Sequence, residues 1–199
     1  QRSVTALVDI SNYVMFEFGQ PTHTFDFDAI RVGPSGKKTI VTRLPHPGET
    51  LTTLDGKPRE MQPGDILVCD EVGALSVAGV MGGADSEVKD STKDVLLEVA
   101  SWNNISIRKT ARFHNFSSEA SYRFARGVHP ELAMLALRRG LHLLQAIAGG
   151  TISAGILDVY PLPAKTVVID LHPARVNRLI GMEIPTADMV RILESLEFT

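Results

Sequence analysis

Cysteine is almost absent from this chain, because Cys69 is the only one among 199 residues. A single cysteine cannot close an internal disulfide, and it cannot build the four-cysteine or two-cysteine, two-histidine sites that hold structural zinc. The six histidines are scattered, and none shows the His-x-x-x-His spacing of a metal pair. The sequence therefore indicates a protein of a reducing compartment, which we expect to be cytoplasmic, without a metal site.

Long hydrophobic runs and an excess of positive charge are also lacking. No apolar run approaches the ~20 residues that cross a bilayer, so we expect no membrane partner. The formal net charge is −3, with 23 acidic residues against 20 basic ones. Autonomous nucleic-acid binders draw most of their affinity from phosphate contacts. The charge therefore argues against an independent RNA-binding domain, and we expect no binding to DNA.

The composition that is present suits a folded protein. Hydrophobic residues make up 44% of the chain and charged residues 22%, which is enough for one or two globular domains with a real core. The chain begins at Gln1 without a methionine and ends at Thr199, directly after an amphipathic helical pattern. We therefore expect a fragment of a larger protein.

Hydrophobic spacing and turn residues predict helices at both ends of the chain around a strand-rich middle. The predicted helices cover residues 3–18, a stretch from Asn103 onward, 130–148, 173–180 and 185–196. The predicted strands cover 39–43, 50–54, 59–61, 65–70, 74–80, 95–99, 152–159 and 166–171, with a hairpin turn at Asp55-Gly56.

The fold class that follows is α+β. We expect a barrel-like mixed β-sheet core flanked by α-helices in three layers, followed by a short helical C-terminal piece. Pro161 and Pro163 indicate a linker between the two. We therefore divide the chain into a main domain over 1–163 and the truncated start of a further, helical module over 164–199.

A hydroxyl, an amide and an imidazole stand close together near the start of the chain. Ser11 and Asn12 fall within the first predicted helix, and His23 falls in the turn that we expect behind Pro21. Three such groups that converge on one point can hold a water molecule for attack on an ester. The alternative is a simple turn histidine beside a surface asparagine.

Two features of the strand-rich middle are unusual. Glu98 interrupts an otherwise apolar strand, Val95–Val99, and a carboxylate in a dry place is costly unless it is paired. Its alternative is plain alternation, with Glu98 facing water. Gly79 opens a glycine-rich stretch that lets a backbone amide approach a ligand, or that forms a β-bulge or tight turn. The stretch lacks the Gly-Lys-Ser/Thr ending of a phosphate loop.

A local basic cluster follows this middle part of the chain. Its members are Arg108, Lys109, Arg112, Arg123 and Arg126. Such a cluster is able to contact RNA phosphates. The commoner alternative is the solvated face of two helices.

Seven segments, spread in order over residues 8–124, together resemble one known family. They are Val-Asp-Ile-Ser-Asn-Tyr-Val-Met (8–15), Gly-Gln-Pro-Thr-His-Thr-Phe-Asp (19–26), Thr-Leu-Asp-Gly (53–56), Ala-Gly-Val-Met-Gly-Gly (78–83), Ser-Glu-Val (86–88), Leu-Glu-Val-Ala (97–100) and Glu-Ala-Ser-Tyr-Arg-Phe (119–124). The sequence resembles the editing region, the third and fourth modules, of the β subunit of bacterial phenylalanyl-tRNA synthetase.

The resemblance implies a post-transfer editing domain over 1–163, part of an ATP-dependent aminoacyl-tRNA ligase. Such a domain hydrolyses the ester of tyrosine mischarged on the tRNA for phenylalanine. The resemblance gives Glu98 the role of accepting the phenol, Gly79 a backbone contact to the tyrosine side chain, and Ala120 a place in the pocket wall. The remaining matches are Ser11, Asn12 and His23, which would position the attacking water or the ester.

The resemblance also implies partners. They are the mischarged 3′ end of that tRNA and the synthetase α subunit in a heterotetramer. It implies no cofactor in this fragment, while the parent enzyme would use ATP and magnesium at a separate site. We favour direct attack by water over a covalent Ser11 intermediate, because no carboxylate is evidently placed to orient His23. The alternative function is a non-catalytic structural and tRNA-positioning module of the same synthetase.

Overall fold

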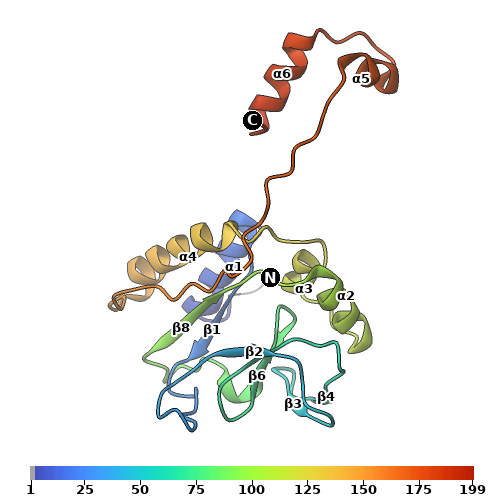
Figure 1. Cartoon of the computed structure of the whole chain (residues 1–199). Coiled ribbons are helices and arrows are strands. Elements are labelled where there is room, and N and C mark those ends of the chain that lie inside the picture. Colours follow the sequence, from blue (N-terminus) through green and yellow to red (C-terminus); the bar gives the residue numbers. More distant parts are fainter. Residues whose placement is uncertain (1–2) are drawn as a thin grey trace. The chain divides into compact units, whose positions relative to one another are not determined.

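The structure is a computed structural model that describes residues 3–199. The chain forms two compact units, a first unit up to Ile156 and a second unit over Leu157–Thr199 (Figure 1). No helix among residues 3–199 has the length and apolar character that spanning a bilayer requires.

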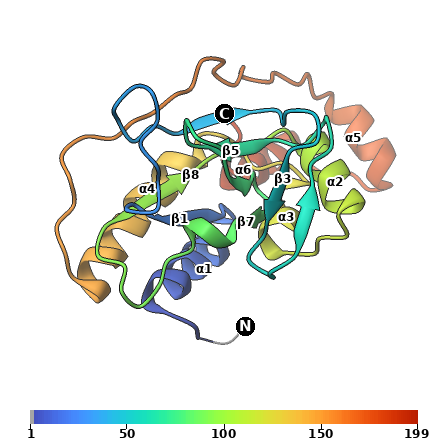
Figure 2. The same cartoon turned by 90° about the horizontal axis from the view of Figure 1, so that it is seen from below.

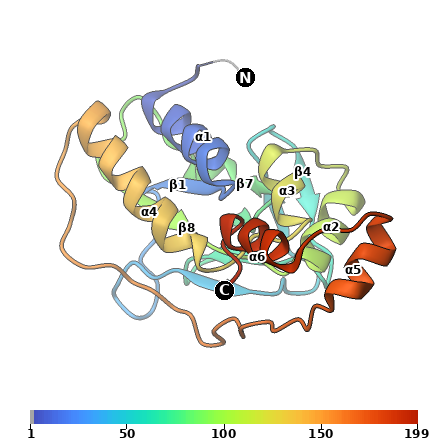
Figure 3. The ribbon, with the colours of Figure 1, turned by 90° about the horizontal axis from the view of Figure 1, so that it is seen from above.

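Two helices of the first unit pack against a two-stranded ladder. Helix α1 (Ala6–Phe18) lies beside α4 (Leu132–Leu143), and both cover the strands β1 and β8 (Figure 3). The side chain of Thr5 caps the start of α1, and Gly19 ends it with a left-handed backbone. The contact buries Ile10 and Val14 of α1, so this layer has an apolar core of its own.

The ladder pairs β1 (Thr22–Asp26) with β8 (Val95–Val99) in antiparallel register. His23 stands opposite Glu98 in this register, so the two side chains share one face of the ladder. The prediction of a turn at His23 is therefore wrong. Thr22, Thr24 and Phe25 are good strand formers, and pairing with β8 extends the backbone directly after Pro21.

The strand-rich middle forms two further sheets. One joins β2 (Val41–Arg43), β5 (Leu67–Cys69), β6 (Ala74–Val77) and β7 (Met81–Gly82) in that order. The other is a hairpin of β3 (Thr50–Thr52) and β4 (Pro58–Glu60), and the predicted turn at Asp55-Gly56 closes it. A short 3-10 helix, Ala84–Ser86, follows β7.

Helices α2 (Asn104–Phe113) and α3 (Glu119–Phe124) lie beside this strand-rich part (Figure 2). Ile107 of α2 and Phe124 of α3 are buried in its core. A buried carboxylate reinforces the packing, because Asp65 accepts hydrogen bonds from Thr110 Oγ1 at 2.6 Å and joins His114 Nε2 at 2.7 Å. These contacts hold α2 against the segment before β5. The N-cap of α3, Ser118, donates from its Oγ to the carbonyl oxygen of Val80 at 3.1 Å and holds α3 against the bend between β6 and β7.

The expected α+β class is confirmed, but the arrangement of the strands differs from the expectation. The ladders formed by residues 3–199 are all antiparallel, and they make three small sheets and no closed barrel. The strands are two to five residues long and are drawn as short arrows in Figure 1, so each sheet covers only part of the core. Helices complete the cover.

From Leu144 onward, the regular secondary structure of the described chain is helical. Helix α4 continues as a π-helical turn, Leu144–Ala148, and the second unit holds α5 (Pro173–Ile180) and α6 (Thr186–Ser195). The strands predicted over 152–159 and 166–171 are wrong, since this stretch is irregular. Its apolar residues match a strand pattern, but they are exposed and no strand of the described chain pairs with them.

Candidate active site

A cavity of about 90 Å³ lies where β1, β8, the β6–β7 bend and α3 meet. His23 reaches it from β1, Glu98 from β8 and Ala120 from α3, while Gly79 forms part of the bend. The cavity has room for one small chemical group rather than for the drug-sized ligands that fill pockets of roughly 300–1,000 Å³. The structure thus brings together four residues that sequence analysis selected from distant parts of the chain.

His23 is held inside the protein without a polar partner. Its ring stands edge-on to Phe25, with centroids 4.4 Å apart, and Nε2 finds no hydrogen-bond partner among residues 3–199. Gly82 leaves the space for this ring, because a Cβ there would lie 3.0 Å from His23 Cε1. Burial lowers the pKa of His23 from 6.5 to about 4, so the imidazole is neutral at neutral pH.

Glu98 lines the cavity rather than facing open water. Its Oε2 is shielded from solvent and meets no hydrogen-bond donor in the described part of the chain. Burial raises the pKa of Glu98 from 4.5 to about 7, because a dry environment disfavours the ionised form. Native proteins satisfy most buried polar atoms, so two unpaired ones in one small cavity indicate a ligand site.

The glycine-rich bend makes a tight turn, and its backbone lies close to two aromatic rings. Gly79 has a φ of +65°, which side chains other than glycine rarely adopt. A Cβ on Gly79 would also lie 2.6 Å from Trp102 Cδ1 and 2.9 Å from Phe124 Cδ2. Glycine therefore lets two aromatic rings stand against the backbone at the cavity wall.

Ser11 and Asn12 lie outside the cavity wall. Ser11 Oγ donates to the carbonyl oxygen of Thr22 at 2.7 Å and shares a second hydrogen bond with Thr22 Oγ1 at 2.9 Å. Thr22 does line the cavity, beside His23. The contact that the structure gives Ser11 therefore holds β1 against α1 and acts on the cavity through Thr22.

We expect Ser11→Ala to lower the free energy of unfolding by about 1–2 kcal/mol, because the hydroxyl makes two part-buried hydrogen bonds. A chain of this size loses about 2–4 °C in Tm per kcal/mol, so thermal unfolding can resolve the change. Ser11→Thr retains the hydroxyl and is the matched control, with a Tm close to that of the unsubstituted chain. An unchanged Tm in Ser11→Ala would show that these bonds do not fix β1.

Four basic residues of the predicted cluster differ in whether their side chains make contacts within the fold. Arg108, Lys109 and Arg112 are exposed on α2. Arg123 of α3 forms an ion pair with Glu119, and its guanidinium group lies over the ring of Phe16 at 5.0 Å. Arg123 thus has contacts within the fold, whereas the three residues on α2 project into solvent.

Two aromatic residues of the cavity wall, Trp102 and Phe124, were not predicted as site residues. Phe124 belongs to a segment used for the family resemblance, but its side chain carries no polar signal. Trp102 is the only tryptophan of the chain and follows Glu98 by four residues. A single tryptophan so close in sequence to a carboxylate in an apolar strand was the signal that could have identified Trp102 as a site residue.

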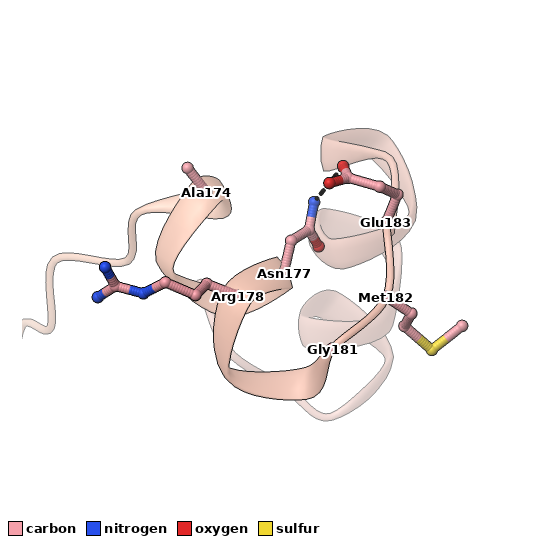
Figure 4. Close-up of a pocket in the computed structure, with 6 residues that line it drawn as sticks. All are labelled: Ala174, Asn177, Arg178, Gly181, Met182 and Glu183. Atoms are coloured by element: carbon pink, nitrogen blue, oxygen red, sulfur yellow. Dashed lines mark hydrogen bonds between the residues drawn. The ribbon is translucent and has the colours of Figure 1, made fainter.

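A larger hollow, of about 450 Å³, belongs to the second unit (Figure 4). Its lining comes from one helix and the turn after it, and Arg178 and Met182 point in opposite directions. Asn177 donates to Glu183 Oε2 at 3.1 Å, which fixes the turn. The hollow gathers no converging reactive groups, so we place the candidate site in the smaller cavity. In the described residues, no three His, Cys, Asp or Glu side chains gather as metal ligands would.

Comparison with the models of known protein families finds one that matches most of the chain. The model of the B3/4 domain matches residues 1–149. The chain belongs to the B3/4 domain family. This assignment covers the whole cavity described above, since its lining residues fall between Pro21 and Phe124.

Curated relatives agree with the resemblance seen in the sequence. The chain is 41% identical to the phenylalanine–tRNA ligase beta subunit of Geobacter sulfurreducens, over 100% of this chain and 24% of that protein. It is 44% identical to the same subunit of Symbiobacterium thermophilum, over 98% of this chain and 21% of that protein. This B3/4 chain therefore spans about a quarter of the length of these relatives, and the predicted resemblance to the β subunit is confirmed.

Proposed function

We propose that this chain is the post-transfer editing part of a phenylalanyl-tRNA synthetase β subunit. In this proposal it hydrolyses the ester that joins tyrosine to the tRNA for phenylalanine. The observation that carries the proposal is the small cavity with Glu98 and His23 side by side on one face of the β1–β8 ladder. Relatives named as beta subunits of phenylalanine–tRNA ligase supply the substrate class.

The chemistry of amino-acid selection explains why such a site is needed. A hydrophobic pocket built for phenylalanine rejects an isostere with one added hydroxyl by only about 10²-fold. A second site improves the selection if it requires that hydroxyl. An acceptor in a dry cavity does so, because phenylalanine leaves it unpaired at a cost of about 1–3 kcal/mol.

Glu98 is the acceptor in this proposal. In its ionised form it accepts a hydrogen bond from the phenol, and the phenol donates because its ordinary pKa is about 10. Ala120 lines the same cavity, and its small side chain takes up little of the space beside Glu98. The backbone of Gly79, in the bend beside them, completes the contact to the side chain.

His23 orients the attacking water. A neutral imidazole with a free ring nitrogen can accept a hydrogen bond from water. The water oxygen attacks the ester carbonyl, the bond to the ribose oxygen breaks, and that oxygen leaves with the proton released by the water. Ser11 holds Thr22 through two hydrogen bonds, which supports water rather than Ser11 as the nucleophile.

The second candidate function is a structural and tRNA-positioning module without catalysis. The exposed Arg108, Lys109 and Arg112 on one helix favour it. It gives no reason, however, for the unpaired buried atoms of the two cavity residues, His23 Nε2 and Glu98 Oε2. In both readings the tRNA, the synthetase α subunit and a separate site for ATP and magnesium belong to the parent enzyme.

The test is release of tyrosine from mischarged phenylalanine tRNA by this chain. We expect hydrolysis above the rate without protein, and His23→Ala to lower it by at least about tenfold, since a positioned acid–base group contributes 10²–10⁴-fold when it acts fully. His142→Ala, at an exposed position of α4, is the matched control and should keep full activity. Hydrolysis no faster than the blank, with normal folding, would favour the structural module.

A further inference from the structure

We propose that Trp102 is a specificity-determining residue: its indole forms the wall on which the aromatic ring of the substrate side chain packs. The proposal rests on the proposed function and adds a second requirement to it. Glu98 selects for a hydroxyl, and Trp102 selects for the flat ring that carries the hydroxyl.

The position of Trp102 suits a rigid wall. The chain leaves β8 after Val99 and places the indole against both apolar clusters of the strand-rich core. Trp102 is nevertheless only half-buried, and it lines the cavity that holds Glu98 and His23. A ring fixed by two clusters keeps its orientation, so contact with a ligand costs little conformational entropy.

The bend at Gly79 is shaped around this ring. A Cβ added to Gly79 would lie only 2.6 Å from Trp102 Cδ1 and 2.9 Å from Phe124 Cδ2. Any side chain there would push both rings away. The two aromatic groups therefore meet at the bend and form an apolar end of the cavity.

The cavity is then lined by both polar and aromatic groups. Glu98 and His23 supply polar atoms from the paired strands, while Trp102 and Phe124 meet at Gly79 and Ala120 adds a small apolar side chain. A phenol has the same division, with a ring that prefers offset or edge-on contact to another ring and a hydroxyl that needs a partner. The lining fits a hydroxylated aromatic side chain better than a hydroxylated aliphatic one.

Fluorescence of the 199-residue chain tests the contact directly, because Trp102 is its only tryptophan. The probe is a hydrolysis-resistant analogue in which tyrosine is joined by an amide bond to the 3′ nitrogen of adenosine. We expect a saturable change in Trp102 emission with this analogue and none with the corresponding threonine analogue at equal concentration. Binding of the tyrosine analogue without any change in emission would overturn the proposal.

Two substitutions separate a wall from a merely structural residue. We expect Trp102→Leu to raise the KM for the tyrosine ester about tenfold with kcat nearly unchanged, because leucine removes the ring–ring contact with the substrate side chain. Trp102→Phe keeps a ring face and should stay within about threefold of the unsubstituted chain. A fall in kcat alone, or equal behaviour of the two variants, would overturn the proposal. An unsubstituted chain that neither binds nor hydrolyses would instead refute the proposed function itself.

Discussion

Replacing Glu98 with glutamine is expected to lower kcat/KM for the tyrosine ester by about tenfold, while leaving the slow hydrolysis of the phenylalanine ester unchanged. Glutamine still offers an acceptor oxygen, but a hydrogen bond to a charged acceptor is worth about 1–1.5 kcal/mol more than one to a neutral acceptor, which is about tenfold in rate. Glutamine has nearly the same shape but no charge, so the cavity keeps its size. The measurement is hydrolysis of both esters on the same tRNA, and equal loss for both would contradict the assignment of Glu98 to the phenol.

The pH dependence of hydrolysis by the unsubstituted chain is a second test of the role of Glu98. Burial raises the pKa of Glu98 to about 7, so the ionised acceptor forms as the pH rises through that value. We expect kcat/KM for the tyrosine ester, after subtraction of the blank, to rise up to about pH 7 and then level off. Glu98→Gln should remove this rise.

The stability of Glu98→Gln is the control for this experiment, because it distinguishes loss of the acceptor from misfolding. The folded chain holds the proton of Glu98 up to about pH 7, whereas an ordinary carboxyl loses it near 4.5. Stability therefore falls as the pH rises through this interval, by up to about 3 kcal/mol at 1.4 kcal/mol per unit. Glu98→Gln has no such cost and should unfold at a higher urea concentration than the unsubstituted chain at pH 8. A lower midpoint would mean that Glu98 supports the fold.

Local signals were enough to predict several elements with their bounds. The strand Val95–Val99 and the helix Pro173–Ile180 form as predicted, and the turn at Asp55-Gly56 joins two paired strands. In each case the apolar pattern, a proline or a glycine turn lies within the element itself. Glu98 was noticed for a similarly local reason, as a charge in an apolar strand.

Three-dimensional neighbours account for what the sequence could not predict. His23 is a strand residue because β8 pairs with β1 from more than seventy positions away in the chain, and Ser11 meets Thr22 rather than the cavity. The apolar stretch 152–171 has the composition of strands but no described partner strand. Trp102 joins the cavity because Gly79 leaves space for its ring, which a pattern along the chain does not reveal.

Substitution of Gly79 by alanine is expected to lower the free energy of unfolding by roughly 2–5 kcal/mol and to abolish hydrolysis of the tyrosine ester. The left-handed backbone costs a non-glycine residue about 1–2 kcal/mol, and displacing packed rings costs about 1–3 kcal/mol more. The displaced rings are Trp102 and Phe124, which stand 2.6 and 2.9 Å from the new Cβ. Urea unfolding and the tyrosine-release assay measure the two effects.

Gly48→Ala separates the two causes. Gly48 has a φ of +73°, close to that of Gly79, but no atom of the described residues outside its own neighbours lies within 4 Å of its added Cβ. It should therefore lose only the backbone share, about 1–2 kcal/mol, and keep full hydrolysis. The difference in the loss of unfolding free energy between the two variants is then the cost of displacing the rings of Trp102 and Phe124. Equal losses would mean that the bend needs glycine for its backbone alone and that the rings are free to move.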